Sequence, residues 1–252
     1  MMDNQFDDFQ KGVVHFTGVS PKEERLLISE IFYSVQGEGI TVGRPSVFLR
    51  LGSCNLHCVW CDTAYTWDWN RYNNEKELVF MNKDDIRDRV LRYRCRRLVV
   101  TGGEPLLQQS ALVELLNDLK ERDFYIEIET NGTLRPIAPL VAITDQWNVS
   151  PKLKNSGNSE EEREQKSCYR VFSSFSGSFF KYVIQNPEDV TEVDGLVARY
   201  ALNKERVILM PEGVSRDVIS EREVWLKKMC TERDYNFSSR LHIRLWDNIR
   251  GT

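Results

Sequence analysis

The sequence predicts an α/β protein, a partial, open βα barrel with mainly parallel strands. Short apolar segments of strand length alternate with longer segments of helical periodicity along the 252 residues. Peptides rich in Gly, Glu, Ser and Lys follow the predicted strands. The carboxyl ends of the strands are where parallel α/β sheets carry their binding and catalytic residues. Right-handed crossover connections would cover this sheet with helices and curl it into a barrel.

The individual elements follow from periodicity and composition. The helix expected over 104–122 has Leu115 and Leu119 on one face with Leu112 and Leu116 beside them, which is the pattern of an amphipathic helix. Further helices are expected over 84–94, between 185 and 204, and over 216–233. Strands are expected over 25–32, 45–51, 96–100, 124–130, within 142–150, and over 179–184, 205–210 and 240–246.

One domain is expected over residues 25–252, preceded by a polar, loosely docked extension at 1–24. The Ser-rich segment 154–178 is expected to be an excursion with a short helix. The extension lacks the apolar core of a signal peptide, and no apolar run is long enough for a transmembrane helix, so we expect a cytoplasmic protein without a membrane partner. A net charge of −4 and the lack of a basic stripe argue against nucleic acid as a partner.

Three of the six cysteines lie in one short segment, "LGSCNLHCVWCDT" at 51–63, as Cys54, Cys58 and Cys61. Three thiolates can bind zinc or an iron–sulfur cluster. Structural zinc requires a fourth ligand, and His57 is too close to Cys58 for comfortable joint ligation. A four-iron cluster held by three cysteines leaves one iron open for a substrate or cofactor, which is the arrangement of a catalytic metal. The other three cysteines are interpreted as ordinary thiols.

Three further peptides lie at predicted strand ends. "VVTGGEP" (99–105) joins a strand to a helix through glycines that allow close backbone approach. "IEIETNG" (126–132) places Glu127 and Glu129 on the strand face opposite the isoleucines, directed into the barrel or toward solvent. "SPK" (150–152) offers a hydroxyl and an ammonium that bind a ligand or merely cap a turn.

The cysteine spacing C-x3-C-x2-C with a later Gly-Gly-Glu turn resembles the radical S-adenosylmethionine superfamily. The resemblance implies a 4Fe-4S cluster held by Cys54, Cys58 and Cys61, whose open iron chelates the amino and carboxylate groups of S-adenosylmethionine. One electron then cleaves the sulfonium to give a 5′-deoxyadenosyl radical. Trp60 matches an aromatic residue expected to contact the adenine; packing within the loop is the alternative.

A narrower resemblance extends over about residues 26–252. The segment "IFYSVQGEGITVGRPSVFLRLGSCNLHCVWCDTAYTW" (31–67), followed by "VTGGEP", "IEIETNGT" and "VSPKL", is similar to the 7-carboxy-7-deazaguanine synthase (QueE) family. The resemblance implies a lyase that contracts the ring of 6-carboxy-5,6,7,8-tetrahydropterin, with loss of ammonia, to 7-carboxy-7-deazaguanine for queuosine and other deazapurines. It also implies catalytic use of S-adenosylmethionine, Mg2+, an electron donor such as flavodoxin, and a homodimer.

The same resemblance assigns roles to individual residues. Thr63 is the expected Mg2+ ligand. The expected substrate contacts are Val35, Gln36, Gly37, Glu38, Arg50 and Thr101, with Arg50 on the substrate carboxylate. The expected cofactor contacts are Trp60, Asp62, Gly102, Gly103, Glu104, Glu129, Ser150, Pro151 and Lys152, with residues 210–213 as a further candidate.

The resemblance has one departure, and two other interpretations stay open. Some members of the family end in H-K-Y-L-N-I-x, which contacts substrate, whereas this sequence ends "RLHIRLWDNIRGT". We expect His242 and Arg250 to complete a strand and a surface tail rather than to replace those contacts. The alternatives to the predicted activity are another radical enzyme, such as a glycyl-radical activase, and a non-enzymatic zinc-binding interaction module.

Overall fold

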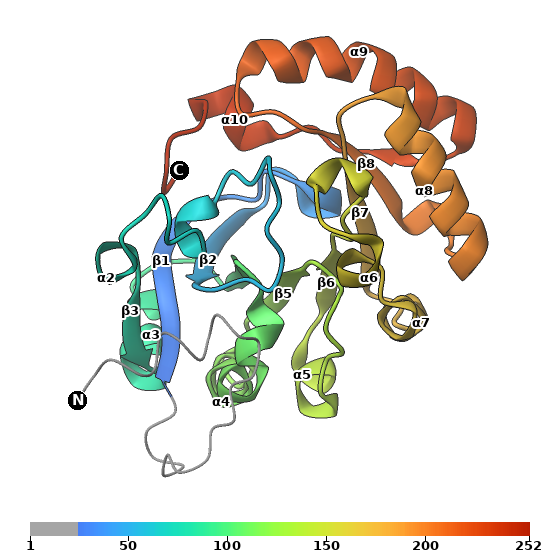
Figure 1. Ribbon diagram of the computed structural model, residues 1–252. Helices are drawn as coiled ribbons and strands as arrows, with labels where there is room; N and C mark the ends of the chain where they lie inside the picture. The colour runs from blue at the N-terminus through green and yellow to red at the C-terminus, as the bar shows by residue number, and fades with distance from the viewer. Residues whose placement is uncertain (1–24) are drawn as a thin grey trace.

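The computed structural model describes residues 25–252, in which one sheet of nine strands forms the centre of the molecule (Figure 1). The predicted extension at 1–24 lies outside the described residues. Along the sheet the strands follow the order β3-β1-β2-β4-β5-β6-β7-β8-β9. Their bounds are β1 Arg25–Val35, β2 Pro45–Leu51, β3 Val79–Asn82, β4 Arg97–Gly102, β5 Tyr125–Thr130, β6 Gln146–Val149, β7 Ser178–Ile184, β8 Val207–Pro211 and β9 Asn236–Phe237.

Most neighbouring strands are parallel. From β2 to β9 every neighbouring pair runs parallel, whereas β1 pairs antiparallel with both β2 and β3. In the described sheet β3 and β9 are the two edges and do not pair with each other, so the barrel is open. The predicted fold class is therefore confirmed.

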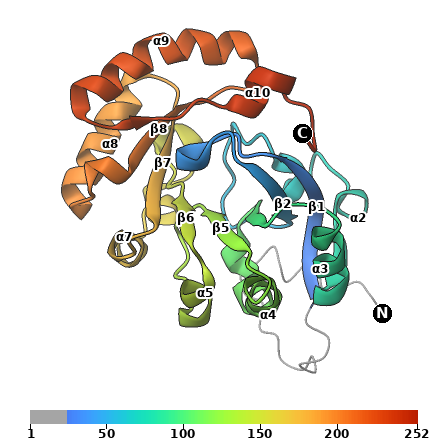
Figure 2. The ribbon, with the colours of Figure 1, turned by 180° about the vertical axis from the view of Figure 1, so that it is seen from behind.

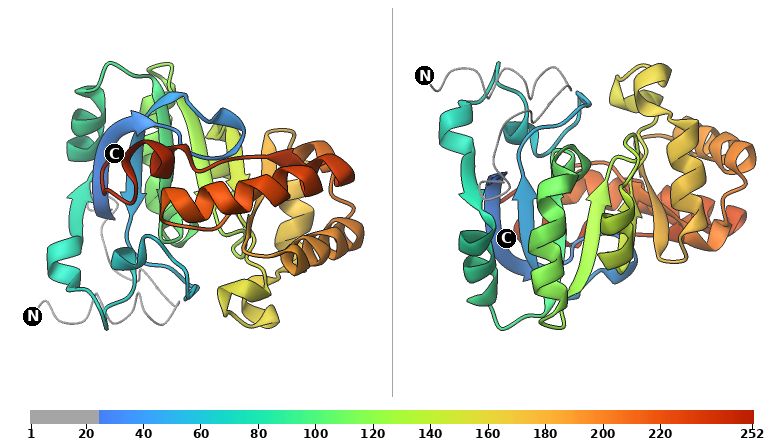
Figure 3. Two further views of the ribbon diagram at one scale, coloured as in Figure 1. Left: turned by 90° about the horizontal axis from the view of Figure 1, so that it is seen from above. Right: turned by 90° about the horizontal axis from the view of Figure 1, so that it is seen from below.

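Helices cover the outer side of the curved sheet (Figures 1 and 2). Seen from above and below in Figure 3, they surround one side of the sheet, and α9 packs on β8 and β9. No helix described between residues 25 and 252 has the length and apolar character needed to cross a membrane. The helices are α2 Asn74–Glu77, α3 Lys83–Leu91, α4 Gln109–Lys120, α5 Ala138–Ile143, α6 Glu160–Arg163, α7 Lys166–Ser174, α8 Pro187–Tyr200, α9 Arg216–Arg233 and α10 Leu241–Trp246, with short 3-10 turns η1 Gly39–Thr41, η2 Ala64–Thr66, η3 Pro105–Gln108, η4 Lys154–Ser156 and η5 Lys204–Arg206.

The core lies between the helices and the outer sheet face. The four leucines predicted to line one side of α4 are fully buried, and Ile126 and Ile128 of β5 join them in the same core. Burial of each such side chain stabilises the fold by about 1.5–3 kcal/mol. Because side chains alternate along a strand, Glu127 and Glu129 face the inside of the barrel. The helix expected from residue 104 begins as the turn η3 and becomes α-helical at Gln109.

The structure differs from the prediction at the C-terminal end and in the segment 154–178. Residues 240–246 were expected to form a closing strand, but 241–246 form helix α10, and the last strand is the two-residue β9. Tertiary contacts decide this: Leu241 N donates to Gly37 O (2.9 Å), and Ile243 is fully buried. Seven residues of apparent alternation are too few to specify a strand against such contacts. The segment 154–178 contains η4, α6 and α7 rather than one short helix.

Candidate active site

A cavity opens at the carboxyl ends of the parallel strands, where the predicted site residues meet. Four strand ends contribute to it: β2 with Arg50, β4 with Thr101, β5 with Glu129 and β6 with the following Ser150. The predicted residues that line the cavity are Val35, Gln36, Gly37, Glu38, Arg50, Cys54, Cys58, Trp60, Cys61, Asp62, Thr63, Thr101, Gly102, Gly103, Glu129, Ser150 and Lys152.

The cysteine loop brings three free thiols to one wall of this cavity. Burial raises the pKa of Cys54 to about 12 and also raises the pKa of Cys58. His57 is exposed; its ring meets Trp67 edge-on at 5.0 Å and does not line the cavity in the described structure. The donor set directed into the cavity is therefore three soft sulfur ligands, which suits an iron–sulfur cluster with one open iron.

The Gly-Gly turn is pressed against the cysteine loop. Gly103 N donates to Leu51 O (3.1 Å), and Glu104 N donates to Ser53 O (2.8 Å). A Cβ atom on Gly103 would lie 1.7 Å from Ser53 O, so only glycine fits. Gly102 has φ +135°, and a Cβ there would lie 2.2 Å from Leu51 O. The two glycines thus serve the contact between two loops that both line the cavity.

Two predicted contacts lie beside the cavity rather than on its wall. Glu104 is fully buried and accepts hydrogen bonds from Leu106 N (2.9 Å), Thr130 Oγ1 (2.8 Å) and Asn131 N (2.7 Å). Burial raises the pKa of this carboxyl group. Its carboxylate therefore caps η3 and fixes the loop after β5. Pro151 is buried between the lining residues Ser150 and Lys152.

A hydrogen-bonded group of polar side chains forms the floor of the cavity. Gln36 Nε2 donates to Glu127 Oε1 (2.7 Å) and Glu129 Oε1 (3.1 Å), and its own Oε1 accepts from Glu38 N (3.2 Å). Thr101 Oγ1 donates to Glu129 Oε2 (2.7 Å). Burial, followed by repulsion from Glu129, raises the pKa of Glu127. These contacts fix the amide of Gln36 in one orientation, with both of its polar atoms used.

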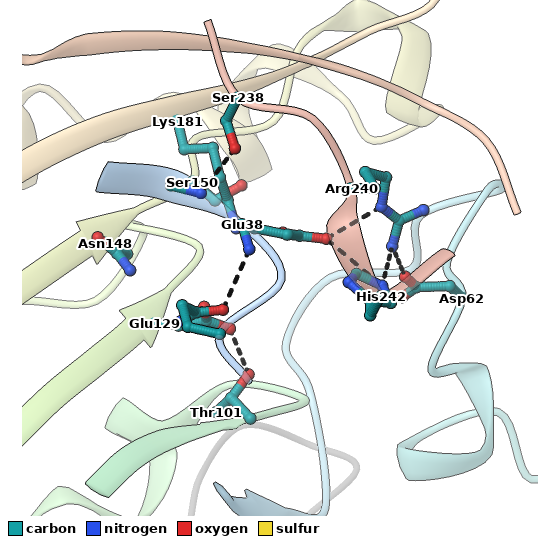
Figure 4. Close-up of polar contacts among 12 residues, drawn as sticks. Glu38, Asp62, Thr101, Glu129, Asn148, Ser150, Lys181, Ser238, Arg240 and His242 are labelled. Atoms are coloured by element: carbon teal, nitrogen blue, oxygen red, sulfur yellow. Dashed lines mark hydrogen bonds and ion pairs between the residues drawn. The ribbon is translucent and has the colours of Figure 1, made fainter. Parts of the chain in front are cut away.

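A charged network, which the sequence did not predict, lines the cavity beside this floor (Figure 4). Lys181 of β7 and Arg240 both form ion pairs with Glu38, Arg240 at 3.0 Å, and Arg240 also pairs with Asp62 beside Cys61. Burial alone would raise the pKa of Glu38, but the two cations hold that pKa well below its usual range. Glu38 raises the pKa of Lys181 to about 12 despite its burial.

His242 and Arg250 differ in their placement. His242 lines the cavity, with Nε2 3.9 Å from Glu38 Oε1, so the prediction that it completes a strand is wrong. Burial lowers the pKa of His242. Arg250 is 42% exposed and pairs with Glu30 and Glu77 as part of the outer surface. No local pattern around Lys181 or Arg240 could have indicated their role, since their partners lie far away in the sequence.

The sheet and the three-thiol cavity define a class of protein, and comparison with known proteins agrees with it. A model of the Radical SAM superfamily matches residues 50–150, which contain the cysteine loop, the Gly-Gly turn and Ser150. The crystal structure of QueE from Escherichia coli superposes with a TM-score of 0.68 at 26% sequence identity, covering 87% of this chain and 96% of that chain.

Curated relatives narrow the class to one family. The 7-carboxy-7-deazaguanine synthase of Pyrobaculum aerophilum is 38% identical over 232 residues, which cover 90% of this chain and 97% of the relative. The protein of the same name from Halobacterium salinarum is 34% identical, covering 90% and 93%. The chain belongs to the 7-carboxy-7-deazaguanine synthase family.

Proposed function

We propose that this protein is a 7-carboxy-7-deazaguanine synthase that converts 6-carboxy-5,6,7,8-tetrahydropterin into 7-carboxy-7-deazaguanine and ammonia. The observation that carries the proposal is one cavity, at the carboxyl ends of the strands, which joins three free thiols to a polar floor and an arginine. The reaction removes one ammonia from the substrate without net oxidation. An enzyme that regenerates its S-adenosylmethionine therefore needs no stoichiometric oxidant.

The residues present fit the cofactors that the family implies. Cys54, Cys58 and Cys61 would hold a 4Fe-4S cluster. Gly103 packs closely against the cysteine loop, so the cavity wall next to that loop is formed by backbone without a side chain. Reductive cleavage of a sulfonium and abstraction of a hydrogen atom are the chemistry that the bound cluster and S-adenosylmethionine supply. Lys152 lies over the Trp60 ring at 5.6 Å, and its Nζ donates to Ser150 Oγ (3.0 Å), which fixes a cation and an aromatic face for the cofactor.

Arg50 and the polar floor would bind the substrate. Arg50 lines the cavity, and its guanidinium can bind an incoming carboxylate in addition to Glu30, whose Oε2 lies 3.5 Å from Arg50 Nε. Glu38 keeps its negative charge because of its two cations, and it can accept hydrogen bonds from the amino and ring N–H groups of a pterin. Gln36 and Thr101 hold Glu129 in place at the floor, which orders the site before substrate binds.

Thr63 is the proposed Mg2+ ligand. Its hydroxyl lies at the cavity wall, with Oγ1 3.6 Å from Cys61 Sγ, and oxygen is the ligand that Mg2+ prefers. With a single protein oxygen, such an ion would keep open positions for substrate atoms and water. A flavodoxin-type electron donor, a homodimer and a cytoplasmic location complete the proposal by analogy with the family.

Anaerobic turnover tests the function. Protein reconstituted with iron and sulfide is given S-adenosylmethionine, a reductant, Mg2+ and the carboxytetrahydropterin, and the deazaguanine product is measured by chromatography and mass. We expect product from the wild type and none from Cys54→Ala, whereas Cys95→Ala, which removes a half-buried thiol outside the loop, should retain activity. A fully loaded wild type that forms no product would overturn the assignment and leave an activase as the alternative. A colourless protein containing zinc would favour the interaction module.

A further inference from the structure

The segment 154–159 binds the cysteine loop along its length, although it belongs to none of the sequence motifs. Ser156 O accepts from Val59 N (3.0 Å), and Asn158 Oδ1 accepts from His57 N (2.9 Å). Asn155 accepts the indole N–H of Trp60 through its backbone oxygen (3.0 Å). Three donors of the loop therefore find their partners in this one short segment.

This segment is itself fixed to the sheet. Asn155 Nδ2 donates to Val183 O of β7 (3.0 Å) and to Asp189 Oδ2 of α8 (2.8 Å). Gly157 has φ +80°, and a Cβ there would lie 2.8 Å from Val59 Cγ1, so the backbone approaches the loop as closely as glycine allows. A rigid clamp results, anchored at the end of β7 and closed on the cysteine loop.

The clamp also reaches the sulfur atoms. Asn158 Nδ2 lies 3.3 Å from Cys58 Sγ as a donor, and from the other side Trp67 Nε1 donates to Cys61 Sγ (3.3 Å). Both are side-chain donors that can be removed without changing a ligand. Hydrogen bonds to a cluster's sulfurs stabilise the more negative, reduced form and so raise its reduction potential.

We propose that Asn158 and Trp67 are positioning residues that set the reduction potential of the cluster. In this proposal the segment 154–159 holds the cysteine loop in place and supplies Asn158, one of the two donors. The inference rests on the proposed function in requiring a cluster on the three cysteines. It gives residues 154–159, the first part of the segment 154–178 for which the sequence indicated no role, a function in tuning the reduction of the cluster. Neither residue needs to touch substrate for this role.

The test is a redox titration of reconstituted protein, followed by electron paramagnetic resonance of the reduced cluster. Trp67→Phe removes one donor and keeps an aromatic ring; Asn158→Leu removes the other at similar volume. At a fixed potential we expect about a tenfold lower ratio of reduced to oxidised cluster for each variant, which corresponds to about 59 mV for one electron. Trp225→Phe, on the outer helix α9, is the matched control and should leave the potential unchanged. Unchanged potentials in both variants at full iron content would overturn the proposal.

Hydrogen exchange of the cluster-free protein separates this inference from the proposed function. Asn158→Leu should speed exchange in the peptide that contains His57 and Val59, because it removes the acceptor of His57 N and loosens the clamp. Trp67→Phe should leave this exchange unchanged. If the wild type never takes up about four irons, the proposed function fails, while the exchange result still decides whether the clamp exists. Asn158→Ser serves as a second variant if the leucine prevents folding.

Discussion

Replacement of Arg240 by methionine should destabilise the protein far more than an ordinary surface change. The Arg240 side chain is 7% exposed and pairs with Glu38 and Asp62 while its Nη1 donates to Gly213 O (2.5 Å). Methionine has similar length but leaves both carboxylates without this cation. Removal of one partner from a buried ion pair costs about 3–5 kcal/mol.

The lower end of that range applies here. Lys181 still neutralises Glu38 in the variant, and Asp62 is 31% exposed, so water can solvate it partly. A loss of about 3 kcal/mol lowers the folding equilibrium constant by roughly 100-fold. Urea unfolding of the cluster-free protein measures this loss as a shift of the midpoint at constant slope.

Arg244 of α10 is the matched control, since Arg240 is the residue directly before this helix. It is 47% exposed and pairs with Glu223 at 2.9 Å, while Lys227 also neutralises that carboxylate. Arg244→Met should cost about 0–1 kcal/mol. Equal losses for the two variants would refute the argument that removal of a buried cation shared by two carboxylates carries the cost. In an Asp62→Asn background the loss caused by Arg240→Met should shrink, because one of those charges is already gone.

Three further changes test other parts of the site. Gly103→Ala should lower the iron content after reconstitution by displacing the cysteine loop, whereas Gly195→Ala, in α8 with open space at its Cβ, should load normally. Glu38→Gln should be less stable than the wild type at pH 7, and the difference in urea midpoint should begin to shrink below about pH 4.5 and vanish once the pH has fallen through the lowered folded-state pKa of Glu38, because the ionised carboxylate is what stabilises the folded protein. Thr63→Ala should retain the cluster and cleavage of S-adenosylmethionine but lose the response of turnover to Mg2+; full turnover at low Mg2+ would remove Thr63 from the metal site.

The sequence predicted those parts of the fold and site that depend on local pattern. The α4 leucines repeat with helical period, and the three thiols and the Gly-Gly turn are compact signals whose chemistry can be recognised without knowledge of the tertiary structure. Residues 240–246 failed because their short alternation carried less weight than contacts with Gly37 and the core. Lys181 and Arg240 were missed because they are 143 and 202 residues from Glu38, and their significance arises only when the chain folds.

These long-range contacts hold together an open barrel at its mouth. The loop between β1 and β2 carries Gln36 and Glu38. Because β3 and β9 do not pair, hydrogen bonds of the sheet do not fix this loop relative to the last strands. The C-terminal segment fixes it instead, since Ser238 Oγ accepts from Gly39 N (2.8 Å) and Leu241 N donates to Gly37 O (2.9 Å). Arg240 then extends these contacts to Asp62 and the cysteine loop. The same contacts that bridge the mouth of the open barrel therefore set the distance between the proposed substrate-binding residues and the proposed cluster. A change in α10 should for this reason affect substrate binding as well as stability.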